Sequence, residues 1–272
     1  MCFRDLQEGE VMKFAAVGDV CVDAYESLDQ YYIGGNPINV AVYLKRLGED
    51  ASYMGIIGDD KYGRMVVDRL TEKEVDISHL KQKSGSTAVT KVEIMDGNRV
   101  FTDYIEGVMA DFKLTEEDIE FLCSHDLVIS GIWGKIEDDL AIMKEKGIPI
   151  AFDFSDQPTH PIVEKAIGDV TFAFFSDDNG DTPELREFMK EMQAKGPELV
   201  VTTMGSKGSL CYDGKEFYKS GIVSCPVVDT MGAGDSFIAG FLRGIMKGED
   251  ISSGMKSGAR NSSVTLGYQG AW

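Results

Sequence analysis

The sequence predicts an α/β protein with a mainly parallel sheet that is covered by helices on both faces. Short apolar runs suited to buried strands alternate repeatedly with helix-length segments of 3.6-residue periodicity. This alternation is typical of parallel sheets, because each return to a parallel strand needs a crossover, usually a helix. Helix-start signals agree with it, since Asn36-Pro37 and the acidic turn at residues 115–118 stand where helices are expected.

Apolar runs and amphipathic segments give the expected elements in chain order. Buried strands are expected at residues 14–20, 51–58, 127–132, 148–154, 170–175 and 199–203. Helices are expected between them at residues 37–47, 62–73, 115–123 and 183–194. The C-terminal part is expected to form a hairpin at 210–218, a strand at 222–228, and helices near 233–246 and 252–265.

Two segments depart from this rhythm, residues 20–33 and 87–105. Both alternate apolar and polar residues, which is typical of strands with one face in water. The dipeptide Asp96-Gly97 favours a tight turn between strands at 88–93 and 99–104. We expect a small antiparallel sheet that projects from the main layer as a lid, although an ordinary surface hairpin would give the same pattern. No linker or repeat interrupts the chain, so residues 1–272 are expected to form one domain with this lid.

Composition excludes several classes of protein. The chain of 272 residues is 43% hydrophobic and long enough to bury a core without disulfides. Its 27 Lys and Arg stand against 46 Asp and Glu, and this acidic balance repels nucleic acid and anionic lipid surfaces. No apolar stretch is long enough to cross a bilayer, and the acidic start of the chain does not resemble a signal peptide.

The five cysteines are scattered and contain no C-x-x-C pair. This pattern indicates reduced thiols, and we expect a cytoplasmic protein. Cys123 and His125 are close in sequence, but two ligands do not make a zinc site.

The segment at residues 227–242 carries the most chemical information. An apolar strand is expected to end at Asp229, a glycine-rich turn follows, and an apolar helix begins. Amides without bulky side chains at a helix N-terminus favour a negative charge. Asp235 lies in the first helical turn, where a carboxylate either caps the helix or accepts a proton from an alcohol that attacks a phosphoryl group. A Rossmann fingerprint fails because Phe237 stands where glycine is needed, and no Walker A loop occurs.

Two motifs resemble those of a known family. Asp229-Thr230-x-Gly232-Ala233-Gly234-Asp235-x-Phe237 is similar to the D-T-x-G-A-G-D-x-F signature of the ribokinase-like (PfkB) carbohydrate kinases. Gly34-Gly35-x-x-x-Asn39 resembles the N-terminal G-G-x-x-x-N motif of the same family. The resemblance covers nearly the whole chain. It implies a ribokinase-like three-layer αβα sandwich with a small β lid and an ATP-dependent phosphotransferase that acts on an alcohol group.

The resemblance also implies roles for individual residues. The family's catalytic base matches Asp235, and the amides of Gly232, Ala233 and Gly234 match those that stabilise the transferred phosphoryl group. The expected substrate-binding residues are Asp19, Asp23, Gly34, Gly35, Asn36, Asn39, Arg99 and Tyr104. Two of them have alternative roles, because Asp19 can cap a turn and Asn36 can cap the following helix.

The nucleotide is expected along a second glycine-rich turn. Residues 202–208 resemble the family's T-x-G-x-x-G segment, so Thr203, Gly205 and Gly208 are expected at the ATP phosphates together with Gly232 and Gly234. An ordinary glycine turn would give the same spacing. Adenine is expected between residues 223–227 and the last helix, with Asn261 and Ser262 as candidate contacts.

The sequence locates the expected metal sites less precisely than the sugar and nucleotide sites. Asp229 resembles a ligand of the monovalent cation, such as K⁺, seen in many family members. Mg²⁺ is expected to bridge the ATP phosphates. The family's N-x-x-E motif is degenerate here because Asn179 and Glu184 are wrongly spaced, and Asp177, Asp178 and Asp181 are the substitute candidates for arranging water around magnesium.

Further segments resemble one branch of the family: residues 34–43, 103–112, 132–134, 151–156 and 270–272. The resemblance implies phosphorylation of fructoselysine, an Amadori compound, at its 6-hydroxyl. Asp103, Glu106 and Asp156 would suit the ammonium groups of such a substrate, and Arg99 its carboxylate, although all four fit a solvated surface equally well. Glucoselysine, fructose, ribose or a nucleoside remain alternative acceptors, as does a non-catalytic sugar-binding module. A homodimer through the lid is expected, with Val89, Val92 or Ile94 at the interface.

Overall fold

A mainly parallel eight-stranded sheet forms the middle layer of the computed structural model, which describes residues 11–95 and 98–272. The strand order is β14-β13-β12-β11-β10-β9-β1-β4. The six strands from β12 to β4 are parallel, whereas β13 pairs antiparallel with both β12 and β14. Their bounds are β1 Lys13–Val17, β4 Asp50–Met54, β9 Leu127–Gly131, β10 Ile150–Asp153, β11 Phe172–Ser176, β12 Leu199–Thr203, β13 Ser209–Tyr212 and β14 Phe217–Ser220.

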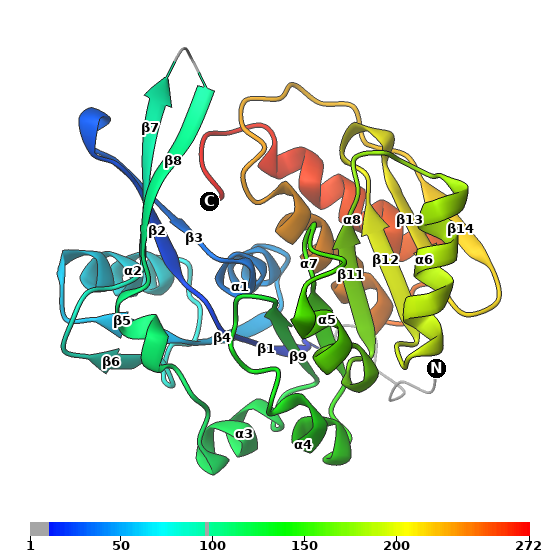
Figure 1. Ribbon diagram of the computed structural model, residues 1–272, viewed down its shortest axis with the longest axis horizontal. Coiled ribbons are helices and arrows are strands. Elements are labelled where there is room, and N and C mark those ends of the chain that lie inside the picture. The colour runs from blue at the N-terminus through cyan, green and yellow to red at the C-terminus, as the bar shows by residue number, and fades with distance from the viewer. Residues whose placement is uncertain (1–10, 96–97) are drawn as a thin grey trace.

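Helices cover both faces of this sheet (Figure 1). Alternate side chains of each strand enter opposite cores, as Phe14 and Val17 do in β1. One face packs against α1 Asn36–Arg46, α2 Lys61–Glu72, α7 Ala233–Met246 and α8 Ile251–Thr265. The other packs against α3 Glu116–Leu122, α4 Leu140–Glu145, α5 Pro161–Ala166 and α6 Pro183–Ala194. The predicted three layers are therefore present.

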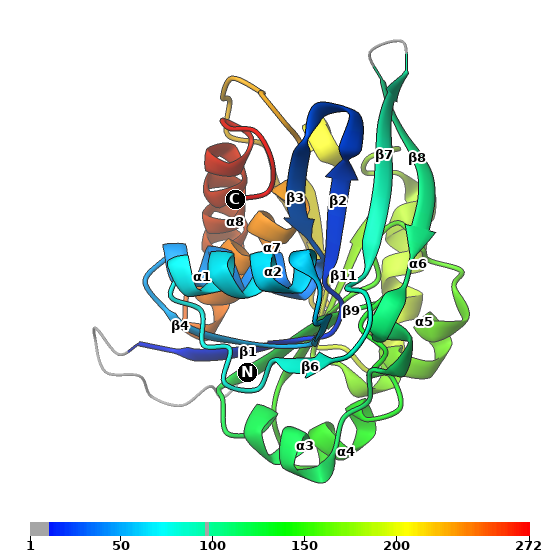
Figure 2. The same cartoon turned by 90° about the vertical axis from the view of Figure 1, so that its left-hand side faces the viewer.

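A second sheet stands apart from these layers as the predicted lid (Figure 2). Its strands are β2 Cys21–Tyr25, β3 Gln30–Gly34, β7 Val89–Met95 and β8 Asn98–Ile105, in the order β3-β2-β7-β8. Both hairpins are antiparallel, but β2 and β7 pair in parallel, so the lid is a mixed sheet. The turn dipeptide Asp96-Gly97 lies outside the described residues. A small parallel pair, β5 Ile56–Gly58 and β6 Lys81–Lys83, lies beneath the lid.

The predicted strand at residues 222–228 is wrong. These residues form no strand, and Val227 and Val228 are 62% and 57% exposed. Sheet pairing stops at β14, and the chain crosses instead to α8, where the Val228 amide donates to the Leu266 carbonyl. The apolar side chains of this segment line a cavity described below. Within the described residues, no helix has the length and apolar character that a bilayer crossing needs.

Candidate functional site

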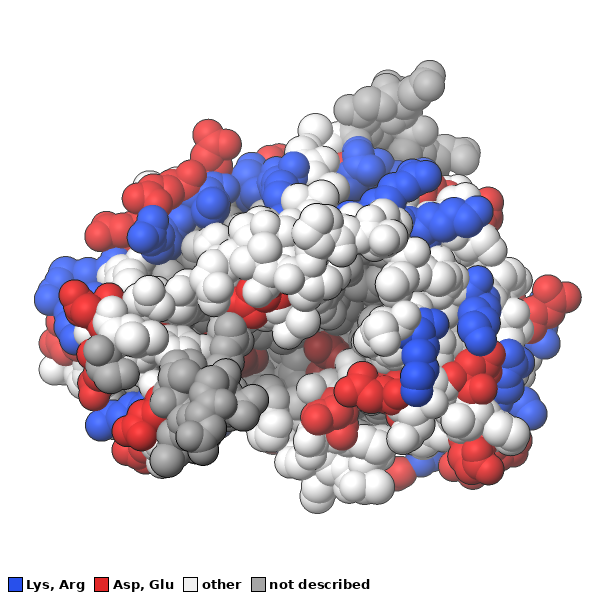
Figure 3. Space-filling model, turned by 90° about the horizontal axis from the view of Figure 1, so that it is seen from above, with Lys and Arg blue, Asp and Glu red and all other residues white. Residues whose placement is uncertain are grey.

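The site lies at the carboxyl ends of the parallel strands, where the main sheet meets the lid and the N-terminus of α7. Viewed from above, this face is hollowed at its centre, and carboxylate side chains lie in and beside the hollow (Figure 3). Asp153 ends β10, and Asp19 lies two residues beyond the end of β1. Open α/β sheets bind their ligands at this edge because the crossovers leave a crevice there.

Asp235 is held by two asparagines of α1. Asn36 Nδ2 donates to Asp235 Oδ1 over 2.8 Å, and Asn39 Nδ2 donates to Asp235 Oδ2 over 2.7 Å. The two asparagines are three residues apart, which places them on one face of the helix. The side chain of Asp235 therefore points to α1 and does not cap its own helix, whose N-cap is Gly232. Its position fits the predicted base.

The two asparagines are themselves positioned by other parts of the chain. Asn36 Nδ2 also donates to Asp153 Oδ2 over 2.9 Å, and the indole of Trp272 donates to Asn39 Oδ1 over 2.7 Å. Asp153 and Trp272 were not predicted as site residues. Asp153 carries the same signal as Asp19, an aspartate at the end of an apolar strand, whereas nothing local in the sequence marks the contact of Trp272.

Three carboxyl groups around this point have raised pKa values. Burial raises the pKa of Asp235 to about 6, against the hydrogen bonds from Asn39 and Asn36 that lower it. Burial, together with the charge of Asp235, raises the pKa values of Asp19 and Asp153 to about 7. Among these three groups, Asp235 is the most readily ionised at neutral pH, as a base must be.

The turn before α1 brings backbone close to Asp19. Gly35 has a φ of 118°, and a Cβ atom there would lie 2.6 Å from the Asp19 carbonyl oxygen. The Asp19 Oδ1 and Asn36 Oδ1 atoms are buried and accept no hydrogen bond from the described part of the chain. Buried acceptors of this kind require a donor, and sugar hydroxyls supply one. Asp23 lies beside Gly34, with Oδ2 within 3.6 Å of a Cβ built on that glycine.

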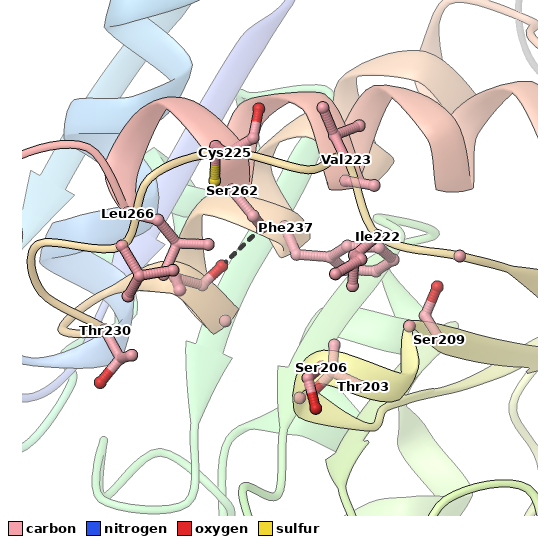
Figure 4. A pocket seen from close by; sticks show the side chains of 18 of the residues that line it. Thr203, Ser206, Ser209, Ile222, Val223, Cys225, Thr230, Phe237, Ser262 and Leu266 are labelled. Atoms are coloured by element: carbon pink, nitrogen blue, oxygen red, sulfur yellow. Dashed lines mark hydrogen bonds between the residues drawn. The ribbon is translucent and has the colours of Figure 1, made fainter.

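A cavity of about 410 Å³ lies between the β12–β13 turn, α7 and α8 (Figure 4). Thr203, Gly205 and Gly208 line one side, as predicted for the nucleotide site, and Ala233 and Gly234 line the end at α7. The remaining lining includes six apolar side chains: Ile222, Val223, Val227, Phe237, Ala259 and Leu266. An apolar slot that ends on a helix N-terminus suits a planar base joined to phosphates.

The amides at this helix N-terminus differ in their availability. The Ala233 amide donates to the Thr230 carbonyl over 3.2 Å, so it is already used, contrary to its predicted role. Among the described residues, the amides of Gly232 and Gly234 donate to no backbone carbonyl. Gly232 has a φ of 72°, and a Cβ there would lie 2.2 Å from the Tyr43 hydroxyl oxygen. The turn thus presents two amides and requires glycine at position 232.

Asn261 does not line this cavity, so its predicted contact with ATP is wrong. Its side chain is 5% exposed, with Nδ2 donating to the Ser236 carbonyl over 2.7 Å and Oδ1 accepting from Arg46 over 2.7 Å. These bonds join α7 to α8 and α1. The next residue, Ser262, does line the cavity, and its hydroxyl donates to the Ala233 carbonyl.

Two of the candidate metal ligands, Asp229 and Asp181, are hydrogen-bonded to other parts of the chain. Asp229 accepts hydrogen bonds from the Gln269 side chain and the Gly270 amide, which tie the C-terminal segment to the loop before α7. Its role toward a monovalent cation stays a prediction. Asp181 is engaged by Arg186 and Lys219, and these contacts lower its pKa to about 2, so it is not a free ligand.

The remaining acidic candidates border a second cavity, of about 740 Å³, beside β11 and α6. Its lining includes Asp156, Asp177, Asp178 and Glu184. In the described part of the chain, no group of three or more His, Cys, Asp or Glu side chains forms a ready metal site.

The lid contributes Tyr104, which was predicted, and Arg99, whose side chain is outside the description. Partial burial raises the pKa of Tyr104 to about 12. The charges of Cys21, Glu106 and Asp19 contribute smaller shifts in the same direction. Tyr104 pairs in register with Thr90, whose hydroxyl lies 3.0 Å from the thiol of Cys21, so Tyr104 belongs to the part of the lid next to the segment that follows Asp19. The backbone of Arg99 pairs with Ile94 near the far end of the hairpin.

Comparison with known proteins gives one consistent family. The model of the family described as "pfkB family carbohydrate kinase" matches residues 15–272. "Fructoselysine 6-kinase" of Escherichia coli (strain K12) is 43% identical over 258 residues, covering 95% of this chain and 98% of the relative. "Fructosamine kinase FrlD" of Bacillus subtilis (strain 168) is 34% identical over 265 residues, covering 96% and 93%.

Solved structures show the same fold. Ribokinase of Arabidopsis thaliana, complexed with ribose and ATP, has a TM-score of 0.85 and 19% identity over 96% of this chain and 94% of that one. Fructokinase of Vibrio cholerae O395, in its fructose, ADP and calcium ion bound form, has a TM-score of 0.77 and 22% identity, with coverages of 96% and 94%. The predicted ribokinase-like fold is confirmed.

Proposed function

Because this chain belongs to the pfkB family of carbohydrate kinases, we propose that it transfers the γ-phosphoryl group of ATP to the 6-hydroxyl of fructoselysine. The products are fructoselysine 6-phosphate and ADP. Two relatives named for fructoselysine or fructosamine, at 43% and 34% identity over nearly the whole chain, support this acceptor. Fructose, glucoselysine, ribose and nucleosides are the alternative acceptors.

The observation that carries the proposal is the position of Asp235. Its carboxylate lies at the N-terminus of α7, directly after Gly234 at the end of the nucleotide cavity, and accepts hydrogen bonds from Asn36 and Asn39 on the sugar side. One carboxylate thus lies where the two halves of the site meet. A sugar-binding module without catalytic activity would have no need for a base at this point.

The proposed chemistry follows from this geometry. Asp235 takes the proton of the 6-hydroxyl while that oxygen forms a bond to the γ-phosphorus, and the bond from the γ-phosphorus to the bridging oxygen of ADP breaks. The amides of Gly232 and Gly234 stabilise negative charge on the phosphoryl oxygens. When bound, Mg²⁺ supplies neutralisation of the phosphate charges, and Asp177 and Asp178 on the second cavity are the side chains suited to hold its water shell.

An acceptor panel tests the proposal. ADP release from ATP is measured with fructoselysine, glucoselysine, fructose, ribose and adenosine, and the phosphorylated carbon is located by NMR. We expect the largest kcat/KM with fructoselysine and a 6-phosphate product. A larger value with another sugar would replace the acceptor, and ADP release that no sugar increases would support the non-catalytic alternative.

The lid remains the proposed dimer surface, with one correction. Val89 and Val92 are 5% and 2% exposed within a single chain, so these two side chains are not available to a partner. Light scattering during size-exclusion chromatography gives the mass that tests the dimer. The four described cysteines are unpaired, which fits the proposed cytoplasmic location.

A further inference from the structure

Two exposed aromatic side chains lie on segments that border the sugar side of the site. Tyr104 is the last but one residue of the lid strand β8 and is 57% exposed. Trp133 lies two residues beyond β9 and is 55% exposed. The ring of Trp133 contacts the ring of His160 edge to face, with the ring centroids 5.9 Å apart. Neither ring belongs to a core, so both are available to a ligand that extends out of the sugar pocket.

An ion pair joins these two segments. The ammonium of Lys135 contacts the carboxylate of Glu106, and their side chains are 38% and 41% exposed. Lys135 itself has a φ of 57°, an uncommon conformation for a residue with a side chain, so the loop holds it in a specific orientation.

The pair lies close to the sugar-binding residues. Gly134 precedes Lys135, and its Cα would lie 2.6 Å from a Cβ placed on Gly18, the neighbour of Asp19. On the lid side, Tyr104 lies two residues before Glu106 and pairs in register with Thr90, whose hydroxyl contacts the thiol of Cys21, two residues after Asp19. A substrate bound at Asp19 that extends past Tyr104 therefore reaches Glu106 and Lys135.

We propose that Glu106 and Lys135 form a subsite for the zwitterionic amino-acid end of the acceptor. The α-carboxylate binds Lys135, the α-ammonium binds Glu106, and the methylene chain lies along Trp133 and Tyr104. The proposal rests on the proposed function, because only a glycated amino acid carries this end. A lysine ammonium has three donors and a carboxylate about four acceptor positions, so each partner retains capacity after pairing with the other. Lys135 thus takes the role that the sequence suggested for Arg99.

Blocked acceptors separate the two charges. ADP release is measured with fructoselysine, with its α-carboxamide and with its Nα-acetyl derivative, on the wild type, Lys135→Met and Glu106→Gln. We expect the wild type to prefer the free acceptor to each blocked one. In Lys135→Met, the preference for fructoselysine over the carboxamide should fall about five- to tenfold. In Glu106→Gln, the preference for fructoselysine over the acetyl derivative should fall by a similar factor.

Two control variants complete the experiment. Lys135→Arg keeps the charge and should keep most of the preference over the carboxamide. Lys144→Met removes an exposed lysine on α4 that pairs with Asp169, and should discriminate as the wild type does. Melting temperatures of all variants identify any that fold poorly.

The possible results differ in what they overturn. A wild type that uses fructoselysine but does not distinguish it from the blocked derivatives overturns the subsite alone. Equal losses with all three acceptors in Lys135→Met and Glu106→Gln also overturn it, because they indicate only a structural ion pair. A wild type that phosphorylates no glycated acceptor overturns the proposed function and the subsite with it.

Discussion

The two halves of the site present different kinds of chemical groups, side chains on the sugar side and mainly backbone groups on the nucleotide side. On the sugar side the polar groups belong to side chains: Asn36 of α1 donates to Asp153 of β10 and to Asp235 of α7. On the nucleotide side, the polar groups are mainly backbone amides and hydroxyls around an apolar cavity. Side chains can be removed singly by mutation, whereas backbone groups are lost only when the turn changes shape. The two halves should therefore respond differently to substitution.

The largest effect is expected from Asp235→Asn. Asn at this position keeps the size of the side chain but cannot accept the proton, so kcat should fall by about 100- to 10,000-fold. The melting temperature should change only moderately, because the new side-chain NH₂ loses one of the hydrogen bonds from Asn36 and Asn39, whereas removing a buried charge relieves a desolvation cost. Steady-state kinetics and thermal unfolding measure the two quantities.

The matched control for this variant is Asp68→Asn on the exposed face of α2, which should retain wild-type kinetics. Near-normal turnover in Asp235→Asn would show that Asp235 is not the base. The side chains on the sugar side would then only bind the substrate.

A pair of glycine substitutions tests the backbone side. Gly232→Ala needs a left-handed conformation and places a Cβ 2.2 Å from the Tyr43 hydroxyl, so the turn must shift. We expect a loss of about 2–4 kcal/mol in the free energy of unfolding and a fall in kcat of more than about tenfold, because the amides move with the turn. Gly234→Ala meets nothing within 4 Å and should cost much less stability. Chemical denaturation compares the two, and equal losses would contradict this account of the turn.

The acid limb of the pH–rate profile tests how the side chains on the sugar side set the pKa of Asp235. Asp235 has a pKa of about 6 and must be ionised to act, so kcat/KM should fall about tenfold per pH unit below that value. The hydrogen bond from Asn39 lowers this pKa, hence Asn39→Ala should move the limb to higher pH. A limb that stays at the same pH in Asn39→Ala would show that another group controls it. Asp19 and Asp153 titrate nearby, so the limb belongs to the cluster.

The comparison also explains which features could be predicted from the sequence. Strand and helix alternation is a local burial pattern, so the three layers were predictable, but α4 and α5 have six residues each and are too short for a periodic signal. Residues 222–228 have the apolar character of a strand because they line a cavity. The glycine turn marked Asp235, whereas its link to Asp153 depends on the arrangement of strands and helices in space.

The smallest effect is expected on the nucleotide side, from Ile222→Ala. Ile222 lines the apolar cavity and is 57% exposed in the chain without nucleotide, so ATP gains only part of a side chain's contact from it. The KM for ATP should rise by about two- to fivefold, with a smaller change in kcat, because several other apolar side chains share the contact. Ile142→Ala on α4, exposed and outside the cavity, is the matched control. A fall in kcat as large as that of Asp235→Asn would show that the cavity positions the reacting groups, and the division between a side-chain half and a backbone half would then be wrong.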